Sequence, residues 1–311
     1  MKKSTLIILL TACVLIVAGL VICGIAVARG ADIRQMARDG DFNLGISVVD
    51  GQFGGNSGYT VCENGEAAFP AAAVSRLDIG WVAGSVEISS YDGDKIQVTE
   101  SASRALEENE KLRWKLEDGV LHLRYCAVGT CNMQAKSLTV LVPAALCLER
   151  LEVGVTSAQL TMDSLVVDGA ILYDGVSGAV EIRNYECERL HIGTVSGEAV
   201  LSGRPQRLEY SSVSGGVRAE GLPEGCTVET DTVSGSVELR FAGCPGEIEG
   251  DSTSGSFTLF LPEDAGFRLD FDSVSGNLDC DFPSLKGVYG GEDRFEMDIS
   301  TTSGDLNIRK N

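Results

Sequence analysis

A tripeptide of the form Val-Ser-Gly or Thr-Ser-Gly recurs from residue 176 onward and constrains the fold more than any other feature of the chain. Successive glycines of this tripeptide are separated by 19, 18, 20, 20, 21 and 28 residues. A period of this length is typical of stacked repeat proteins. The glycines are Gly178, Gly197, Gly215, Gly235, Gly255, Gly276 and Gly304, and Gly84 holds the same place in an earlier unit.

Apolar residues keep constant distances from these glycines. The positions seven and five residues before the glycine, and two and four after it, are mostly apolar. A spacing of two predicts a strand with one buried face on each side of the glycine, and the odd step between the two pairs predicts a corner. We expect glycine at the corner because it reaches positive φ without a Cβ clash. The position seven before holds Ile171, Leu190, Leu208, Val228, Ile248, Leu269 and Met297.

One repeat cannot fold alone. Its four or five inward side chains each contribute roughly 1.5 to 3 kcal/mol when buried, whereas ordering some 20 backbone residues costs about 1 to 2 kcal/mol apiece. Neighbouring repeats must therefore stack and share a core. The sequence predicts an all-β fold, a parallel β-solenoid (β-helix) of roughly 20-residue rungs in which every strand pairs with its equivalent in the next rung, preceded by one N-terminal transmembrane helix.

The N-terminus has the composition of a membrane anchor. An apolar run covers residues 6–28 after a short tip, residues 1–5, and roughly 20 apolar residues span a bilayer. Two alternatives stay open: Ala26-Val27-Ala28 resembles a signal-peptide cleavage site, and Leu10-Thr11-Ala12-Cys13 resembles a lipidation box. We expect an uncleaved single-pass anchor in a bacterial cell membrane, with the N-terminus inside and the bulk of the chain extracytoplasmic.

The remainder divides into a stalk and a solenoid. Residues 29–73 are Gly-rich, lack a sustained period and predict a flexible stalk. The solenoid is expected over residues 74–311. Residues 91–150 should form irregular rungs with an Asp118-Gly119 hairpin, and residues 151–311 regular rungs. Because the chain stops after the strand that ends near Ile308, we expect the last rung to expose an unpaired edge, blunted by Arg309 and Lys310.

The charge excludes one class of partner. The formal net charge is -20 and the pI about 4.5, whereas nucleic-acid binding needs clustered Lys and Arg. We therefore expect no nucleic-acid partner.

The repeated serines and aspartates have both structural and chemical interpretations. A catalytic serine needs one nearby base, so a serine in every corner instead indicates a ladder of hydroxyls that satisfies backbone groups. The aspartates four residues before the glycine suit Asx-turns. Alternatively Asp231, Asp251 and Asp272, expected in consecutive rungs, could stack about 5 Å apart and bind calcium. We predict no catalytic residues and no cofactor.

Cysteine and histidine offer two further candidates. Cys126 and Cys131 flank a short turn and could form a disulfide. His122 lies near both and makes at best a weak metal triad; a surface histidine beside a hairpin is the simpler explanation. Cys280 falls in an inward column and is expected to behave as a small hydrophobic residue.

The order of features resembles a known family. An apolar anchor, the Leu141-Val142-Pro143 strand end and serial Val-Ser-Gly rungs, with Val180-Glu181-Ile182 and Val237-Glu238-Leu239 following two of them, resemble the bacterial putative adhesin family of envelope proteins of unknown function. The resemblance covers roughly residues 75–311. It implies a membrane-associated β-solenoid and carries over no catalytic residue.

These observations predict a non-enzymatic, membrane-anchored cell-envelope protein that displays its solenoid to a protein or glycan partner, for adhesion, scaffolding or envelope-stress signalling. The alternative is a carbohydrate-active β-helix enzyme, a lyase or hydrolase with its site in loops 91–135 or 284–293. Such an enzyme would be expected to gather acids and bases on one patch, and the sequence shows no such constellation.

Overall fold

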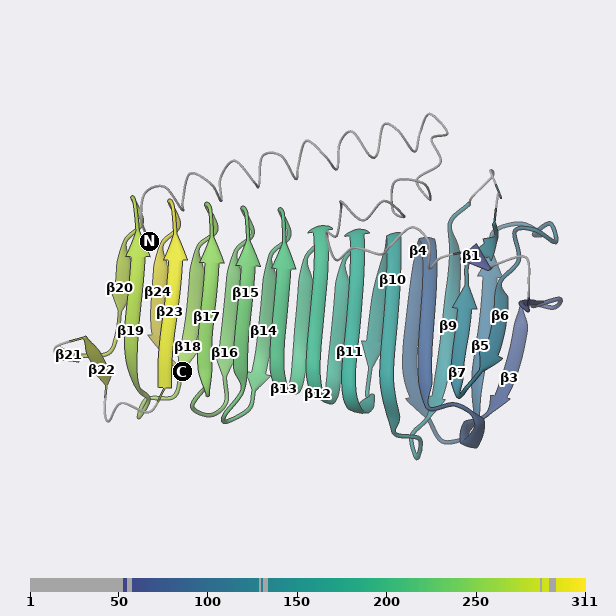
Figure 1. Ribbon diagram of the computed structural model, residues 1–311, viewed down its shortest axis with the longest axis horizontal. Coiled ribbons are helices and arrows are strands. Elements are labelled where there is room, and N and C mark those ends of the chain that lie inside the picture. The colour runs from purple at the N-terminus through teal and green to yellow at the C-terminus, as the bar shows by residue number, and fades with distance from the viewer. Residues whose placement is uncertain (1–52, 55–57, 129, 131–133, 286, 291–294) are drawn as a thin grey trace. The chain divides into compact units, whose positions relative to one another are not determined.

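Strands stacked in a row of rungs make up most of the described chain (Figure 1). The computed structural model describes residues 53–54, 58–128, 130, 134–285, 287–290 and 295–311, which belong to one unit, Ser47–Asn311. The strands are β1 (Phe53–Gly54), β2 (Thr60–Val61), β3 (Glu66–Pro70), β4 (Arg76–Tyr91), β5 (Lys95–Ala102), β6 (Arg113–Glu117), β7 (Val120–Arg124), β8 (Cys126–Ala127), β9 (Lys136–Pro143), β10 (Leu148–Asp163), β11 (Val166–Ser177), β12 (Val180–Ser196), β13 (Ala199–Ser212), β14 (Val217–Leu222), β15 (Thr227–Thr232), β16 (Val237–Phe241), β17 (Glu247–Ser252), β18 (Phe257–Leu261), β19 (Gly266–Ser273), β20 (Leu278–Cys280), β21 (Ser284–Leu285), β22 (Val288–Gly290), β23 (Phe295–Thr301) and β24 (Leu306–Lys310).

One 3-10 helix, η1 (Ala71–Ala73), joins these strands. In the part of the chain that the structure describes, no helix is both long and apolar enough to cross a bilayer. The anchor predicted at residues 6–28 lies outside the described residues.

Each rung contributes one strand to each of two parallel sheets. The first sheet runs β7, β4, β10, β11, β12, β13, β15, β17, β23 and β19. The second runs β9, β4, β10, β12, β13, β14, β16, β18, β24 and β20. Long strands belong to both sheets because they continue through a corner or bend. The predicted parallel solenoid is confirmed.

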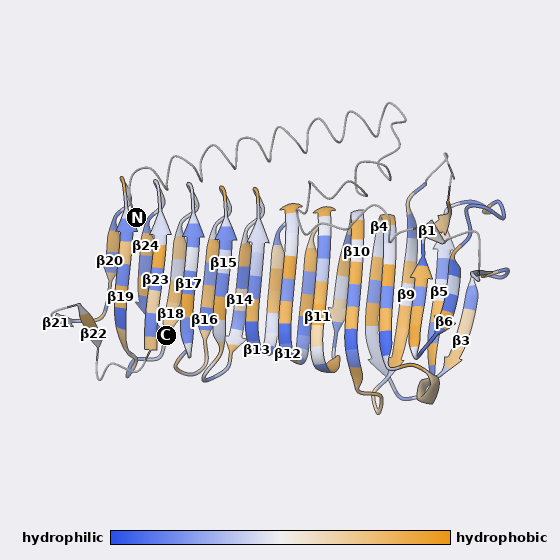
Figure 2. Cartoon of the chain, viewed as in Figure 1, coloured by the Kyte–Doolittle hydropathy of each residue, from blue (hydrophilic) through white to orange (hydrophobic). Residues whose placement is uncertain are grey.

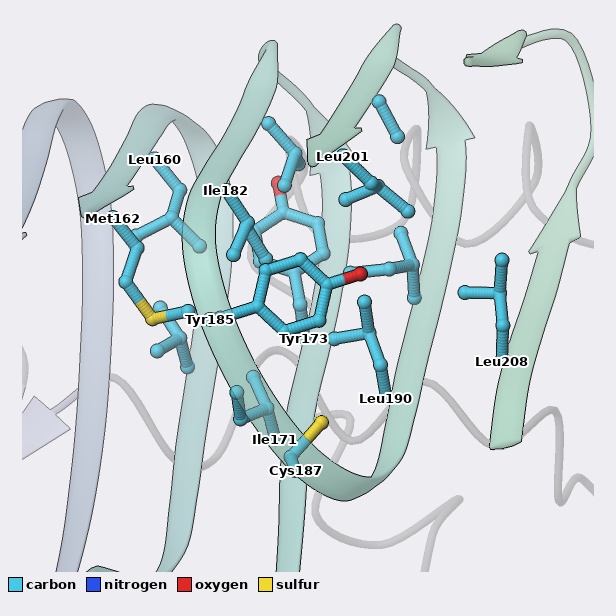
Figure 3. Close-up of a cluster of buried hydrophobic side chains, with 14 of the residues drawn as sticks. Leu160, Met162, Ile171, Tyr173, Ile182, Tyr185, Cys187, Leu190, Leu201 and Leu208 are labelled. Carbon is cyan, nitrogen blue, oxygen red and sulfur yellow. The ribbon is translucent and has the colours of Figure 1, made fainter. Parts of the chain in front are cut away.

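The core lies between the two sheets, and the predicted columns fill it. Hydrophobic and hydrophilic residues alternate along the strands (Figure 2), as one buried face per strand requires. All positions seven before the glycine are buried except Leu269, which is partly exposed. Side chains from successive rungs, such as Ile171, Leu190 and Leu208, contribute to one shared cluster (Figure 3). This shared core is what a single rung could not supply.

The spatial order of the rungs differs from the sequence order at both ends. At the N-terminal end, β4 lies between β10 and the rung formed by β7 and β9, although it precedes both. At the C-terminal end, β23 and β24 insert between the rung of β17 and β18 and that of β19 and β20. The expectation that each rung pairs with the next in sequence is therefore wrong at these two places. Long connections make the exchange possible, because a residue spans up to ~3.3 Å of extended chain.

Antiparallel strands cap the N-terminal end. β6 pairs with β7 and β5 with β9, and β2 and β3 pair in turn with β6 and β5. The predicted hairpin is confirmed: Asp118 and Gly119 have φ values of 50° and 76°, as a type I′ turn requires. Residues 60–61 and 66–70 are thus strands of the cap, which corrects the stalk expected there.

The C-terminal end differs from the expectation. Since β24 lies between β18 and β20, the final strand in sequence is not an edge. Arg309 instead ties β24 to β20, with its Nη2 2.6 Å from Asp279 Oδ2. The predicted loop 284–293 contains the β21–β22 hairpin, and β22 pairs antiparallel with Gly266–Arg268 of β19; residues 291–294 lie outside the described residues.

The corner glycines are required chiefly by close approach. Gly84 and Gly178 have positive φ, 107° and 133°, as predicted. In the other six corners, an added Cβ would lie 1.8–2.1 Å from the carbonyl oxygen of the glycine in the adjacent corner. The explanation by positive φ is therefore wrong for Gly197, Gly215, Gly235, Gly255, Gly276 and Gly304.

Candidate functional site

The outward surface of the first sheet carries three columns of polar side chains, which we call the ladder face. Parallel pairing in register places equivalent residues of adjacent strands about 4.8 Å apart. From β13 to β19 in spatial order, the columns are Arg207, Thr227, Glu247, Glu296 and Arg268; Glu209, Glu229, Glu249, Asp298 and Asp270; and Ser211, Asp231, Asp251, Ser300 and Asp272.

Opposite charges alternate at the β12–β13 end of the ladder face. Glu209 lies 2.5 Å from Arg189 Nη2 and 2.7 Å from Arg207 Nε, and His191 Nδ1 lies 3.3 Å from it. Arg207 also reaches Glu229 at 2.6 Å. Burial works against ionisation of Glu209, but hydrogen bonds from Arg189 and Arg207 outweigh it and hold its pKa below the ordinary value.

Carboxylates dominate the other end. On β15, β17, β23 and β19 the three columns contain nine carboxylates and one arginine. Burial, followed by repulsion from Asp251, raises the pKa of Asp231. Burial and then Asp298 raise the pKa of Asp251, and burial and then Asp270 raise that of Asp298. This acidic half of the ladder face therefore has an electrostatic strain that a positively charged partner would relieve.

The three aspartates proposed for calcium are not brought together. Asp231 pairs in register with Asp251, but Ser300 separates Asp251 from Asp272 because β23 inserts between β17 and β19. Within the described residues, no group of three or more His, Cys, Asp or Glu side chains could hold a metal ion. His122 of the predicted triad instead contacts Asp78, with Nδ1 2.7 Å from Oδ2, and Cys131 lies outside the described residues.

The serine ladder is confirmed. In all seven corners the serine hydroxyl donates a hydrogen bond to a backbone carbonyl of the neighbouring corner at 3.2–3.4 Å. Ser234 Oγ, for example, donates to the Val213 carbonyl at 3.2 Å. These hydroxyls join one rung to the next, so their role is structural.

Sequence reasoning missed a second set of hydroxyls. The corner N–H groups of Gly215, Gly255, Gly276 and Gly304 each donate to a Ser or Thr oxygen three residues earlier, at 2.6–2.9 Å. The aspartates four residues before the glycine were expected to cap these turns, but in these four corners the next residue along the chain does so; it follows an aspartate in two of them, after Asp251 and Asp272. A column of Ser and Thr, interrupted by Gly175, was the available signal: Thr194, Ser212, Thr232, Ser252, Ser273 and Thr301.

Comparison with known proteins identifies the family. The family model described as Toastrack DUF4097 matches residues 74–309, most of the chain. The chain belongs to the Toastrack DUF4097 family. This agrees with the resemblance seen in the sequence.

Solved structures are similar to the toastrack domain at low identity. A putative cell adhesion protein from Clostridium sporogenes is 12% identical over 79% of this chain and 99% of its own, with a TM-score of 0.27. A putative adhesin from Bacteroides fragilis is 11% identical over 78% and 95%, with a TM-score of 0.42. One from Parabacteroides distasonis is 12% identical over 81% and 98%, with a TM-score of 0.44. No curated protein shows a match to the sequence.

A buried ion pair joins β5 of the cap to β9 of the outermost rung, beside the region 91–135 named for the enzyme alternative. Lys136 Nζ lies 2.5 Å from Glu100 Oε1, and the two side chains are 1% and 2% exposed. The ammonium also donates to the carbonyls of Glu110 and Tyr125 and lies over the rings of Trp81 and Tyr125. All three lysine donors therefore have partners within the protein.

The described cysteines of the toastrack domain differ in burial: Cys126, Cys187 and Cys226 are buried, Cys244 and Cys280 are partly exposed, and Cys147 is exposed. Burial raises the pKa of Cys187 and of Cys226 to about 12, which keeps both as thiols at neutral pH. Cys280 is partly exposed and packs against the core. Cys126 is buried, and its predicted partner Cys131 lies outside the described residues, so the disulfide stays a prediction.

Proposed function

We propose that this protein is a non-enzymatic, membrane-anchored component of the bacterial cell envelope whose solenoid displays the ladder face to a protein or glycan partner. The proposal combines the apolar segment 6–28 with a rigid scaffold that holds charged side chains in register. Adhesion, scaffolding and envelope-stress signalling all use such a surface.

The acidic half of the ladder face is the observation that supports the proposal best. The carboxylates of Asp231, Asp251 and Asp298 face like charges across adjacent strands, and burial together with this repulsion raises the pKa of each. Stability alone does not require this arrangement, because repulsion between paired strands destabilises a sheet. A partner with basic groups would gain affinity from it, and the gain would fall with salt.

A binding screen with matched variants tests the display role. The full chain in detergent is screened against arrays of glycans and of envelope proteins for both binding and turnover. The variant Glu249→Gln/Asp251→Asn/Asp298→Asn should weaken binding to a hit at least fivefold. The control Glu66→Gln/Glu107→Gln/Glu108→Gln removes three exposed carboxylates from the cap region and should leave binding unchanged.

Two outcomes would overturn the display role. Cleavage of a glycan by the full chain would favour the carbohydrate-active enzyme. Equal loss of binding in both triple variants would show that net charge alone matters and that the ladder face is not the binding surface.

Membrane anchoring has its own test. Membranes from cells that express the full chain are washed with alkaline carbonate. The molecular mass of the protein that stays in the pellet is then measured by mass spectrometry. We expect the uncut mass in the pellet and protease access from outside the cell. A product shortened near residue 28, or release by carbonate, would contradict an uncleaved anchor.

A further inference from the structure

The outermost rungs at the two ends of the solenoid differ in how well they are covered. At the N-terminal end, β5 and β6 cover the outermost rung, and its inward residues Leu123 and Leu138 are both 0% exposed. The outermost rung at the other end consists of β19 and β20 (Figure 1). Its inward residues Leu269, Phe271 and Cys280 are only partly buried.

Apolar side chains gather at this C-terminal end. Four large hydrophobic residues are exposed in the described part of the chain, and three belong to this end: Val274 at 69%, Leu278 at 37% and Leu285 at 76%. The adjacent inner rung shows what coverage achieves, because Ile299 and Leu306, which occupy the same columns as Phe271 and Leu278, are 0% exposed.

Backbone groups at this end also lack strand partners. Among the described residues, β22 is the one strand on the outer side of β19, and it stops at Arg268; no described strand lies outside β20. Leu269 N–H donates outward to Gly287. Alternate residues of a strand direct their N–H and C=O groups to the same side. The backbone groups of Phe271 and Ser273 therefore also point away from β23, toward the open edge of the sheet. Such an edge is a template for one more strand.

The charges beside this edge select the kind of strand. Asp270 and Asp272 alternate with the inward residues of β19, whereas Asp279 on β20 is already paired with Arg309. A second copy of this chain meeting end to end would bring these carboxylates against their own equivalents, on a chain that carries a net charge of -20. A strand that alternates apolar and basic residues would match both the inward apolar side chains and the outward aspartates.

We propose that the outer edge of β19 and β20 binds an extended segment of a partner protein, with alternating apolar and Lys or Arg residues, as an added β-strand. This goes beyond the proposed function, because it concerns backbone pairing at the outer edge of β19 and β20. Asp270 and Asp272 also belong to the last strand of the ladder face, but the triple variant changes neither of them. Leu269–Ser273 accommodate about five residues, or roughly 16 Å of strand.

The test uses a fluorescent nonapeptide of alternating Lys and Val with the full chain in detergent, measured by fluorescence anisotropy. Two further peptides carry N-methyl groups on the backbone nitrogens of all Val or of all Lys, which blocks one or the other edge of the peptide strand. Strand addition predicts that one methylated peptide loses at least tenfold in affinity and the other does not. Equal binding of all three would show nonspecific charge attraction and overturn the proposal.

Protein variants locate the site. Two variants are compared: Phe271→Asp, and Leu278→Asp at a more exposed position. Each adds a negative charge but removes an apolar contact. Both should weaken binding at least fivefold, whereas the control Val166→Asp, at an exposed residue of β11, should not. Unchanged or tighter binding by both edge variants at an unchanged melting temperature would refute the site.

Sedimentation of the full chain distinguishes the other occupant. A concentration-dependent dimer that Leu278→Asp abolishes would show that a second copy covers this end, against the proposal. The peptide assay probes the edge of β19 and β20, whereas the triple variant probes partner binding by the ladder face. Failure of one proposal therefore does not imply failure of the other.

Discussion

Substitution of one corner glycine by alanine tests the central packing feature of the solenoid. In Gly235→Ala the new Cβ would lie 1.8 Å from the Gly215 carbonyl oxygen and 2.8 Å from its carbon. Real Cβ atoms essentially never approach within 3.0 Å of a heavy atom. Both obstructing atoms are backbone, so no side chain can rotate away. The two rungs must therefore separate at this corner by more than 1 Å, roughly the difference between these distances.

The cost can be worked from the contacts that separation breaks. Overpacking of a buried site costs about 1–3 kcal/mol. Ser234 N–H and Oγ both donate to the Val213 carbonyl, at 3.0 and 3.2 Å, and each hydrogen bond contributes about 1 kcal/mol. We therefore expect a loss of about 3 kcal/mol or more, which lowers the melting temperature by roughly 6–12 °C for a unit of this size.

The assay compares melting temperatures of the full chain in detergent. Gly154→Ala is the matched control: Gly154 lies inside β10 without positive φ, and the nearest atom to an added Cβ is the Ile79 carbonyl oxygen at 4.0 Å. That variant should be neutral or slightly stabilising, by up to about 1 kcal/mol. If Gly235→Ala melted at the same temperature as Gly154→Ala, close approach of the corners would not be the reason for glycine.

Three further predictions concern the core, the cap and the ladder face. Lys136→Met leaves the Glu100 carboxylate buried without its ammonium partner and should lower the free energy of unfolding by about 3–5 kcal/mol, measured by urea denaturation. The double variant with Glu100→Gln should recover much of this loss. A single variant as stable as the unmodified chain would contradict the buried ion pair. Tyr185→Phe removes a buried hydroxyl that has no hydrogen-bond partner among the described residues and should raise the melting temperature by roughly 2–4 °C; a decrease would reveal a partner. Burial and like charges raise the pKa values of Glu249 and Asp251, so the folded state binds their protons more tightly than the unfolded state does and stability falls as pH rises through these values. Glu249→Gln/Asp251→Asn should therefore melt above the unmodified chain at pH 7, with the difference vanishing below the ordinary carboxylate pKa range; a constant difference across pH would refute the assignment.

The sequence predicted only part of the ladder face. The outward position of Asp231, Asp251 and Asp272 followed from the column spacing, and Asp231 does lie beside Asp251. The insertion of β23 between β17 and β19 placed Ser300 in the middle of the expected triad. A hydrogen-bonding role for the corner serines was predictable because one residue type recurred in every rung.

The sequence by itself determined the rung. Inward columns at constant offsets from a glycine specify two strands and a corner, because a strand alternates its faces with period two. The tertiary structure decided the order in which rungs stack. Equivalent rungs offer similar edges and similar inward side chains, so local pattern does not distinguish sequential pairing from insertion. The long connection between Cys280 and Phe295 allows the chain to double back, and packing of the whole stack selects which edge β23 and β24 occupy.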